Sequence, residues 1–202
     1  MKHWSQRDTH ISAVVDYART RIQKADQDRI ETFIRAFFRN APPEDLVARP
    51  VDMLFGIALS MWKFAERRTP GQPRIRVFNP TIEEHGWHTS HSVIQMVNDD
   101  MPFLVGSVTG NLAAAGTDVH FVIHPMMTTI RDADGRRTID NSEGGSAEIR
   151  ESLIHLEIDR KTTKGILDSI QGRITATLAD VRAAVEDWPA MTTAMEDAIA
   201  GL

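Results

Sequence analysis

The sequence has no cysteine among its 202 residues. This absence excludes disulfides, thiolate nucleophiles and cysteine-ligated zinc sites, and it fits a reducing compartment. The sequence also lacks any apolar run that approaches the roughly 20 residues of a membrane helix, and its first ten residues contain no apolar signal core. We therefore expect a cytoplasmic protein with no membrane contact.

Positive charge is scarce as well. Lys and Arg number 23 against 28 Asp and Glu, which gives a formal net charge of -5. Binding to a phosphate backbone relies on an excess of positive charge, so we expect no nucleic-acid partner. The 42% hydrophobic content is ordinary for a globular protein, and the length suits one fair-sized domain or two small ones.

The first third of the chain has the spacing of amphipathic helices. Apolar residues recur at intervals of three and four within residues 11–22, 30–38 and 51–65. Arg67 and Arg68 suit the C-terminus of the third helix. A segment rich in Pro and Gly follows at residues 69–73, so we expect a helical subdomain over residues 1–70.

From residue 74 onward, apolar and polar residues alternate in short segments, which is typical of β-strands. Strands are predicted within residues 75–79, 93–97, 119–130 and 154–158, and helices over 103–115 and 166–188. From Val93 the order is strand, helix, strand, strand, helix, which is typical of ferredoxin-like and ACT domains. We therefore predict an α+β fold: a helical N-terminal subdomain, and over residues 74–188 an ACT-like antiparallel sheet with helices on one face. Pro189 is expected to end the long helix and to leave a short helix over residues 189–202.

An ordered set of segments carries a family resemblance. The segments are RIRVFNP (74–80), EEHGW (83–87) followed by His91, VNDDMPFLV (97–105), VHFVIHP (119–125), IHLEIDR (154–160) and LADVRAAVEDW (178–188). Together they resemble the N-terminal region of the large bacterial NAD-specific glutamate dehydrogenases. In that family, ACT-like modules precede a catalytic domain that oxidises L-glutamate to 2-oxoglutarate and ammonia with NAD.

The resemblance implies that this chain is a regulatory or assembly module and is not itself an enzyme. The sequence contains no Gly-x-Gly-x-x-Gly dinucleotide motif, which agrees with NAD being bound elsewhere in the parent enzyme, so we expect no cofactor in this chain. The implied partners are the remaining domains of the parent, further copies in a homo-oligomer and an amino-acid effector. A module that binds no ligand and serves only docking or oligomerisation is the alternative.

The resemblance places the candidate ligand site at the turn after the first ACT strand. In ACT domains this turn resembles Asp-x-Pro-Gly, and effectors bind near it. The candidate residues here are Asn98, Asp99, Asp100, Met101 and Phe103. Asp100 suits the helix N-cap and Pro102 the first helical turn. Phe103 stands where glycine is expected, so its ring is predicted either to fill the pocket or to lie in the core of a module without a ligand.

Two groups of histidines raise a second alternative, a metal-dependent enzyme. His85, His88 and His91 lie near Glu83 and Glu84, but we favour a polar loop anchored by Trp87 over a zinc site.

The other group is His120, His124 and His155, with the carboxylate of Glu157. These residues would share one sheet face if Phe121 and Ile123 lay on the opposite, helix-covered face. Histidines that pack and hydrogen-bond beneath another element are the preferred interpretation.

Overall fold

Helices built from the first third of the chain form one layer of the fold. The structure, a computed structural model, describes residues 2–138 and 147–200. The helices of this layer are α1 (Lys2–Arg19), α2 (Gln27–Phe38), α3 (Pro43–Val47) and α4 (Val51–Phe64), with a 3-10 turn, η1 (Lys24–Asp26), before α2. Their apolar spacing directs Phe33, Phe37 and Met61 into a shared core, in which each side chain is buried. The short helix α3 was not predicted.

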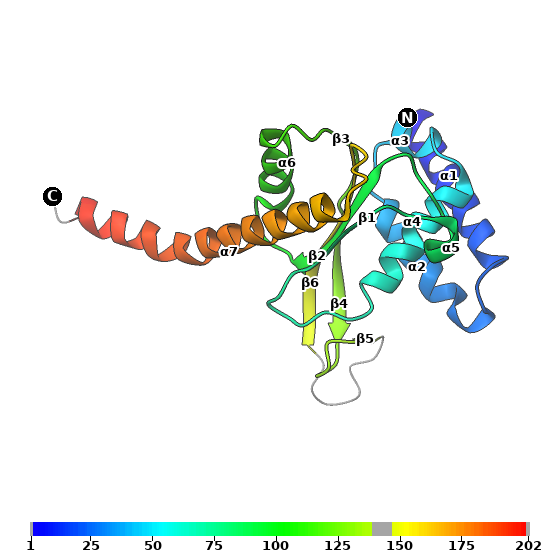
Figure 1. Cartoon of the computed structure of the whole chain (residues 1–202). Helices are drawn as coiled ribbons and strands as arrows, with labels where there is room; N and C mark the ends of the chain where they lie inside the picture. The colour runs from blue at the N-terminus through cyan, green and yellow to red at the C-terminus, as the bar shows by residue number, and fades with distance from the viewer. Residues whose placement is uncertain (1, 139–146, 201–202) are drawn as a thin grey trace.

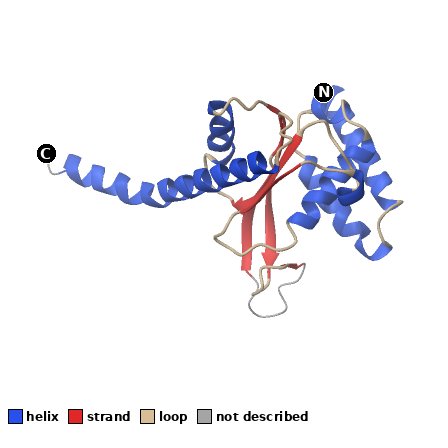
Figure 2. Ribbon diagram, in the orientation of Figure 1, coloured by secondary structure: helices blue, strands red, loops and turns tan. Residues whose placement is uncertain are grey.

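An antiparallel sheet forms the next layer (Figure 2). Its strands are β1 (Arg74–Phe78), β2 (Ser92–Asp99), β3 (Val119–Ile123), β4 (Met126–Arg131), β5 (Arg137–Thr138) and β6 (Ala147–Ile158). The long strand β6 is central, because β2 pairs along one side of it while β3 and β4 pair in succession along the other. β1 extends the sheet beyond β2, and β5 extends it beyond β4.

A proline explains why β3 and β4 are separate strands. Pro125 lies between them and has no backbone N–H to donate to a ladder. Its carbonyl nevertheless accepts a hydrogen bond of 3.0 Å from the backbone N–H of Leu153, so β6 continues past the break. In a βαββαβ unit, the last strand lies beside the first strand. Here β1, which precedes the unit in the chain, takes that place and pairs with β2.

Each face of the sheet carries its own hydrophobic core. On one face, β6 residues Ile154 and Leu156 meet Val108 of α6 (Leu104–Ala114) and Ile174 of α7 (Lys164–Ala200). The N-terminal helices cover the other face and share a core with β2, β3 and β6. The ACT-like α+β fold, with its own helices α6 and α7 on one face, is thus confirmed. The division into domains at residues 70–74 stays a prediction.

The C-terminal helix α7 is continuous from Lys164 to Ala200, so the prediction that Pro189 ends it was wrong. Proline removes one main-chain hydrogen bond, but a helix of 37 residues retains the others on both sides of it. Figure 1 shows the distal part of α7 extending away from the sheet and the other helices. Within the described ranges, no helix is both long and apolar enough to cross a membrane.

Candidate functional site

The turn predicted to bind an effector lies where β2 ends and α6 begins. Asn98 and Asp99 are the last residues of β2, and Phe103 precedes the first turn of α6. The backbone of Phe103 has φ 70°, and this is the one positive φ outside glycine among the described residues. The conformation is the left-handed one that glycine adopts readily and other L-residues disfavour.

Two expectations about this turn were wrong. Phe103 does not lie in the core, because its side chain is 73% exposed. Asp100 is not the N-cap of α6, which begins later, and Phe103 takes that position. The left-handed backbone explains both results: it delays the start of the helix and turns the ring outward.

Asp99 joins two elements that are distant in the sequence. Its carboxylate accepts a hydrogen bond of 2.6 Å from Arg68, in the connection between α4 and β1, and one of 2.8 Å from Arg182 of α7. Burial alone would raise the pKa of Asp99, but the hydrogen bonds and charges of the two arginines lower it below its ordinary value. Asp99 therefore stays ionised and holds α7 to the end of the sheet.

Asp100 is also paired within the fold. Its Oδ1 accepts a hydrogen bond of 2.8 Å from the hydroxyl of Ser152, and Oδ2 lies 3.3 Å from Nε of Arg150. A ligand ammonium could use either aspartate only by competing with these partners.

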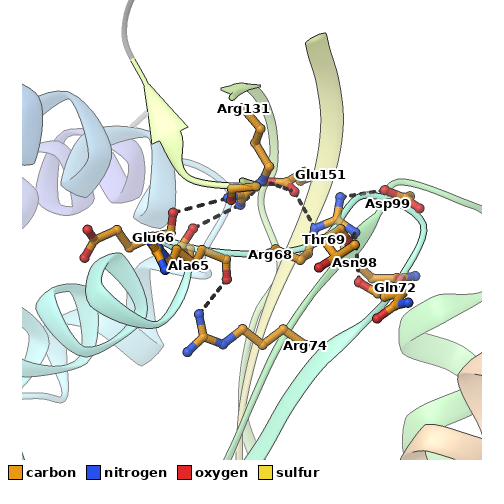
Figure 3. A network of polar contacts seen from close by, with 12 residues as sticks. Ala65, Glu66, Arg68, Thr69, Gln72, Arg74, Asn98, Asp99, Arg131 and Glu151 are labelled. Carbon is orange, nitrogen blue, oxygen red and sulfur yellow. Dashed lines mark hydrogen bonds and ion pairs between the residues drawn. The ribbon is translucent and has the colours of Figure 1, made fainter. Parts of the chain in front are cut away.

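A buried ion network lies directly behind the turn (Figure 3). The carboxylate of Glu151 accepts hydrogen bonds from Nε of Arg68 and, at 2.8 Å each, from Nε and Nη2 of Arg131. Arg131 also donates to the backbone carbonyls of Ala65 and Gly135. All three charged side chains are 1% exposed, so the network ties the end of α4 to β4 and β6 inside the protein.

Sequence reasoning missed this network. Arg68 was expected to lie at the end of the third helix, yet α4 ends at Phe64 and Arg68 is buried. Glu151 belongs to the first half of β6, which was predicted as a strand only from residue 154. A spacing of two residues was the signal that could have extended the strand. It places every second side chain on one face: Glu151, Leu153, His155 and Glu157.

An open pocket of about 480 Å³ lies against the turn. It is lined by Asp100, Met101 and Phe103, by the first residues of α6, and by His124 and Met126. Nε2 of His124 is buried without a hydrogen-bond partner among the described residues. Burial lowers the pKa of His124, and the charge of Asp100 opposes this shift only partly. Of the predicted site residues, Asp100, Met101 and Phe103 border this hollow, whereas Asn98 and Asp99 do not line it.

On the opposite sheet face, a second polar cluster lies beneath the N-terminal helices. Nδ1 of His155 lies 3.3 Å from the amide nitrogen of Gln95. Oε2 of Glu157 lies 3.4 Å from Nη2 of Arg49 and 3.3 Å from Nδ1 of His91. Burial lowers the pKa of His155, although Glu157 opposes the shift. His155 thus packs and hydrogen-bonds through Nδ1 beneath the N-terminal helices, as was preferred for its group, while its Nε2 has no hydrogen-bond partner among the described residues.

The structure does not bring His120, His124 and His155 together. A β-bulge between Val119 and Phe121 shifts the register, so Phe121 and Ile123 pair with Glu157 and His155 and share their face. The expectation that these apolar residues lie opposite His155 was therefore wrong.

Each remaining histidine of this group has its own surroundings. His120 pairs with Asp159 at 2.8 Å, and His124 borders the α6 pocket. In residues 2–138 and 147–200, no three His, Asp or Glu side chains are arranged to hold a metal ion.

The histidines of residues 85–91 also diverge. His85 ends the single-turn helix α5 (Ile82–His85), which was predicted as loop, and its ring stacks on Phe78 at 4.7 Å. His88 is exposed, whereas Trp87 is 2% exposed and packs against α4 at Gly56. Trp87 anchors the segment, as expected.

Comparisons with known proteins agree with this fold. Residues 33–174 match the family described as "Glutamate dehydrogenase, ACT1 domain". The chain is 34% identical over 98% of its length to the NAD-specific glutamate dehydrogenase of Halomonas elongata, and 33% identical over 81% to that of Pseudomonas aeruginosa. It spans 13% and 10% of these two relatives. The chain belongs to the family of glutamate dehydrogenase ACT1 domains.

Proposed function

We propose that this chain is an assembly and regulatory module of an NAD-specific glutamate dehydrogenase, and that its main task is to hold other domains of the parent in place. The parent would convert L-glutamate and NAD to 2-oxoglutarate, ammonia and NADH in the cytoplasm. Its nucleotide chemistry would belong to other domains, since this sequence has no dinucleotide motif.

The observation that carries the proposal is an apolar stripe on α7 that continues beyond the sheet. In the first half of the helix, Ile170, Ile174 and Leu178 lie on the sheet and are at most 5% exposed. The same face continues in the second half with residues that are 57–69% exposed: Trp188, Met191, Met195 and Ile199. Their spacing of three and four keeps them on one side of the helix, which is the pattern of a helix that docks.

The occupant that we propose for this distal stripe is another domain of the parent chain. The chain spans only about a tenth of its relatives, so most of the parent surface belongs to other domains. The Asp99–Arg182 ion pair fixes α7 to the sheet six residues before Trp188, so the stripe is presented at a defined place. A second copy of the chain, as in the expected homo-oligomer, is the competing occupant.

Mixing the chain with the remainder of the parent enzyme, made as a separate polypeptide, tests the proposal. Calorimetry should detect binding, and Trp188→Glu or Met195→Glu should weaken it at least tenfold, because each places a charge in an apolar contact. Ala190→Glu is the matched control, since it adds the same charge to the opposite side of the helix.

Two results would contradict the proposal. One is equal weakening by Ala190→Glu. The other is a chain that dimerises through the distal stripe, seen by sedimentation, while showing no affinity for the remainder of the parent.

A second candidate, amino-acid sensing at the turn, is favoured by the open pocket beside Phe103. We propose that a ligand would contact Asp100, Met101 and Phe103, which line this pocket; Asn98 and Asp99 of the predicted site lie outside its lining. An amino-acid effector at a hundred times its dissociation constant would stabilise the chain by about 2.7 kcal/mol, which a melting experiment detects. If Asp100→Asn abolishes this stabilisation, the site is supported. If the stabilisation is unchanged in Asp100→Asn, the effector binds elsewhere.

A further inference from the structure

A mostly apolar hollow that the proposed function does not use lies between α2, α4 and β4. Its volume is about 590 Å³, within the range of roughly 300–1,000 Å³ that is usual for small-molecule sites. We call it the α2–β4 pocket. Its walls are mostly apolar, and the residues that matter for the argument are Arg29, Phe33, Trp62, Met127, Ile130 and Arg137.

An arginine forms one wall of the α2–β4 pocket. The guanidinium of Arg137 stacks over the ring of Trp62 with its central carbon 3.6 Å from the ring centroid, and it donates a hydrogen bond of 3.2 Å to the backbone carbonyl of Trp62. Burial first, and then the charges of Arg131 and Arg29, lower the pKa of Arg137 to about 10. It therefore remains a cation at neutral pH.

The charge of Arg137 is offset only in part in the described part of the chain, by the carboxylates of Glu151 and Glu66, which form no ion pair with it. Arg131, its neighbour, is neutralised by Glu151, but no carboxylate of residues 2–138 or 147–200 forms an ion pair with Arg137. A partly buried cation with this environment favours an anionic ligand.

A second arginine reaches the same hollow from α2. The guanidinium carbon of Arg29 lies 5.5 Å from the ring centroid of Trp62. Its Nε is buried and has no hydrogen-bond acceptor among the described residues. Asp26 pairs with Arg29 at 3.6 Å from Nη1 and leaves Nε without an acceptor, and the carboxylate of Asp28 also lines the pocket. An unsatisfied buried donor is costly, and an acceptor on a ligand would remove that cost.

We propose that the α2–β4 pocket binds a small carboxylate with an apolar body. The planar carboxylate suits the donor geometry of guanidinium groups, and its charge would offset those of Arg29 and Arg137. The apolar body would pack against Phe33, Met127 and Ile130. The apolar majority of the lining favours such a molecule over inorganic phosphate or a nucleotide. Met126 borders both this site and the pocket beside Phe103, but the two share no other lining residue, and this site does not depend on the docking of α7.

Calorimetric titration of the chain with three probes tests the proposal. Phenylpyruvate supplies a carboxylate and an apolar ring, phenethylamine supplies the ring with a cation, and inorganic phosphate supplies the anion without the ring. Phenylpyruvate should bind, and the other two should bind at least about tenfold more weakly. Arg29→Gln should weaken phenylpyruvate binding about tenfold, whereas Arg35→Gln should leave it unchanged. Arg35 lies on the same helix, pairs with Glu31 and does not line the pocket.

The controls separate this proposal from the docking role. Melting curves should show that both variants fold, because Arg29 and Arg35 are 36% and 47% exposed and neither lies in the hydrophobic core. Trp188→Glu should leave phenylpyruvate affinity unchanged, since the distal stripe is not part of this site. Equal binding of phenethylamine, equal binding of phosphate, equal weakening by Arg35→Gln, or no binding of phenylpyruvate would each overturn the proposal.

Discussion

Phe103 has a backbone conformation that residues with a side chain rarely adopt. Its φ of 70° suits glycine, and its exposed ring gains little from burial. The family resemblance located this position, because the ACT pattern has glycine there. The outward direction of the ring could not be predicted, since the resemblance fixes the turn but not where a bulky substitute points.

Replacing Phe103 with glycine should therefore stabilise the chain. The left-handed conformation costs an L-residue about 1–2 kcal/mol, and the greater freedom of unfolded glycine offsets about 0.5–1 kcal/mol of the gain. We expect thermal unfolding of Phe103→Gly to shift upward by about 2 °C. Phe103→Ala keeps the Cβ and should give no such rise, so an equal rise in both variants would argue against backbone strain.

At the scale of elements, the buried Arg68–Glu151–Arg131 network joins the α4–β1 connection to β4 and β6. Glu151→Gln would leave Arg131 buried without a counter-charge and Arg68 with the carboxylate of Asp99 alone. We expect the free energy of unfolding to fall by about 3–5 kcal/mol, measured by urea denaturation.

Glu148→Gln is the matched control for this change, because Glu148 lies on the same strand but is exposed. It should alter stability by less than about 0.5 kcal/mol. If Glu151→Gln also lowered the free energy of unfolding by less than about 0.5 kcal/mol, the network would contribute little to stability.

The same carboxylate predicts a dependence of stability on pH. Burial would raise the pKa of Glu151, but hydrogen bonds and charges from Arg131 and Arg68 lower it below its ordinary value of 4.5. Its contribution is thus fully present above pH 4.5 and is lost as the pH falls through the lower folded pKa. Below pH 4.5, urea denaturation should show stability falling more steeply with acidity in the wild type than in Glu151→Gln. Parallel curves would contradict this assignment.

Periodicity predicted most of the elements but not their exact pairing. The alternation around Ile154 and Leu156 located β6, and the three-and-four spacing located α2, α4 and α7. The bulge at His120 was not predictable, because the extra residue is defined only by the partner strand, and it overturned the expected histidine face. β5 has only two residues, too few for a periodic signal.

At the scale of the whole molecule, the sheet is covered on both faces by helices of the same chain, and the distal half of α7 is left outside that packing (Figure 1). The sequence predicted the ACT-like sheet and the amphipathic character of α7. It could not predict which half of the stripe the chain itself would bury, because the stripe runs longer than the sheet that it crosses. The exposed half is the basis of the proposed assembly role.

Hydrogen exchange over residues 186–200, compared between the isolated chain and the intact parent enzyme, tests this account most directly. In the isolated chain this part of α7 extends away from the sheet (Figure 1), so its amides should exchange quickly while those of residues 170–181, which pack on the sheet, exchange slowly. In the parent enzyme, docking of the distal stripe should slow exchange over residues 186–200 by at least about tenfold. Equally fast exchange in both proteins would contradict the docking of α7 on the rest of the enzyme.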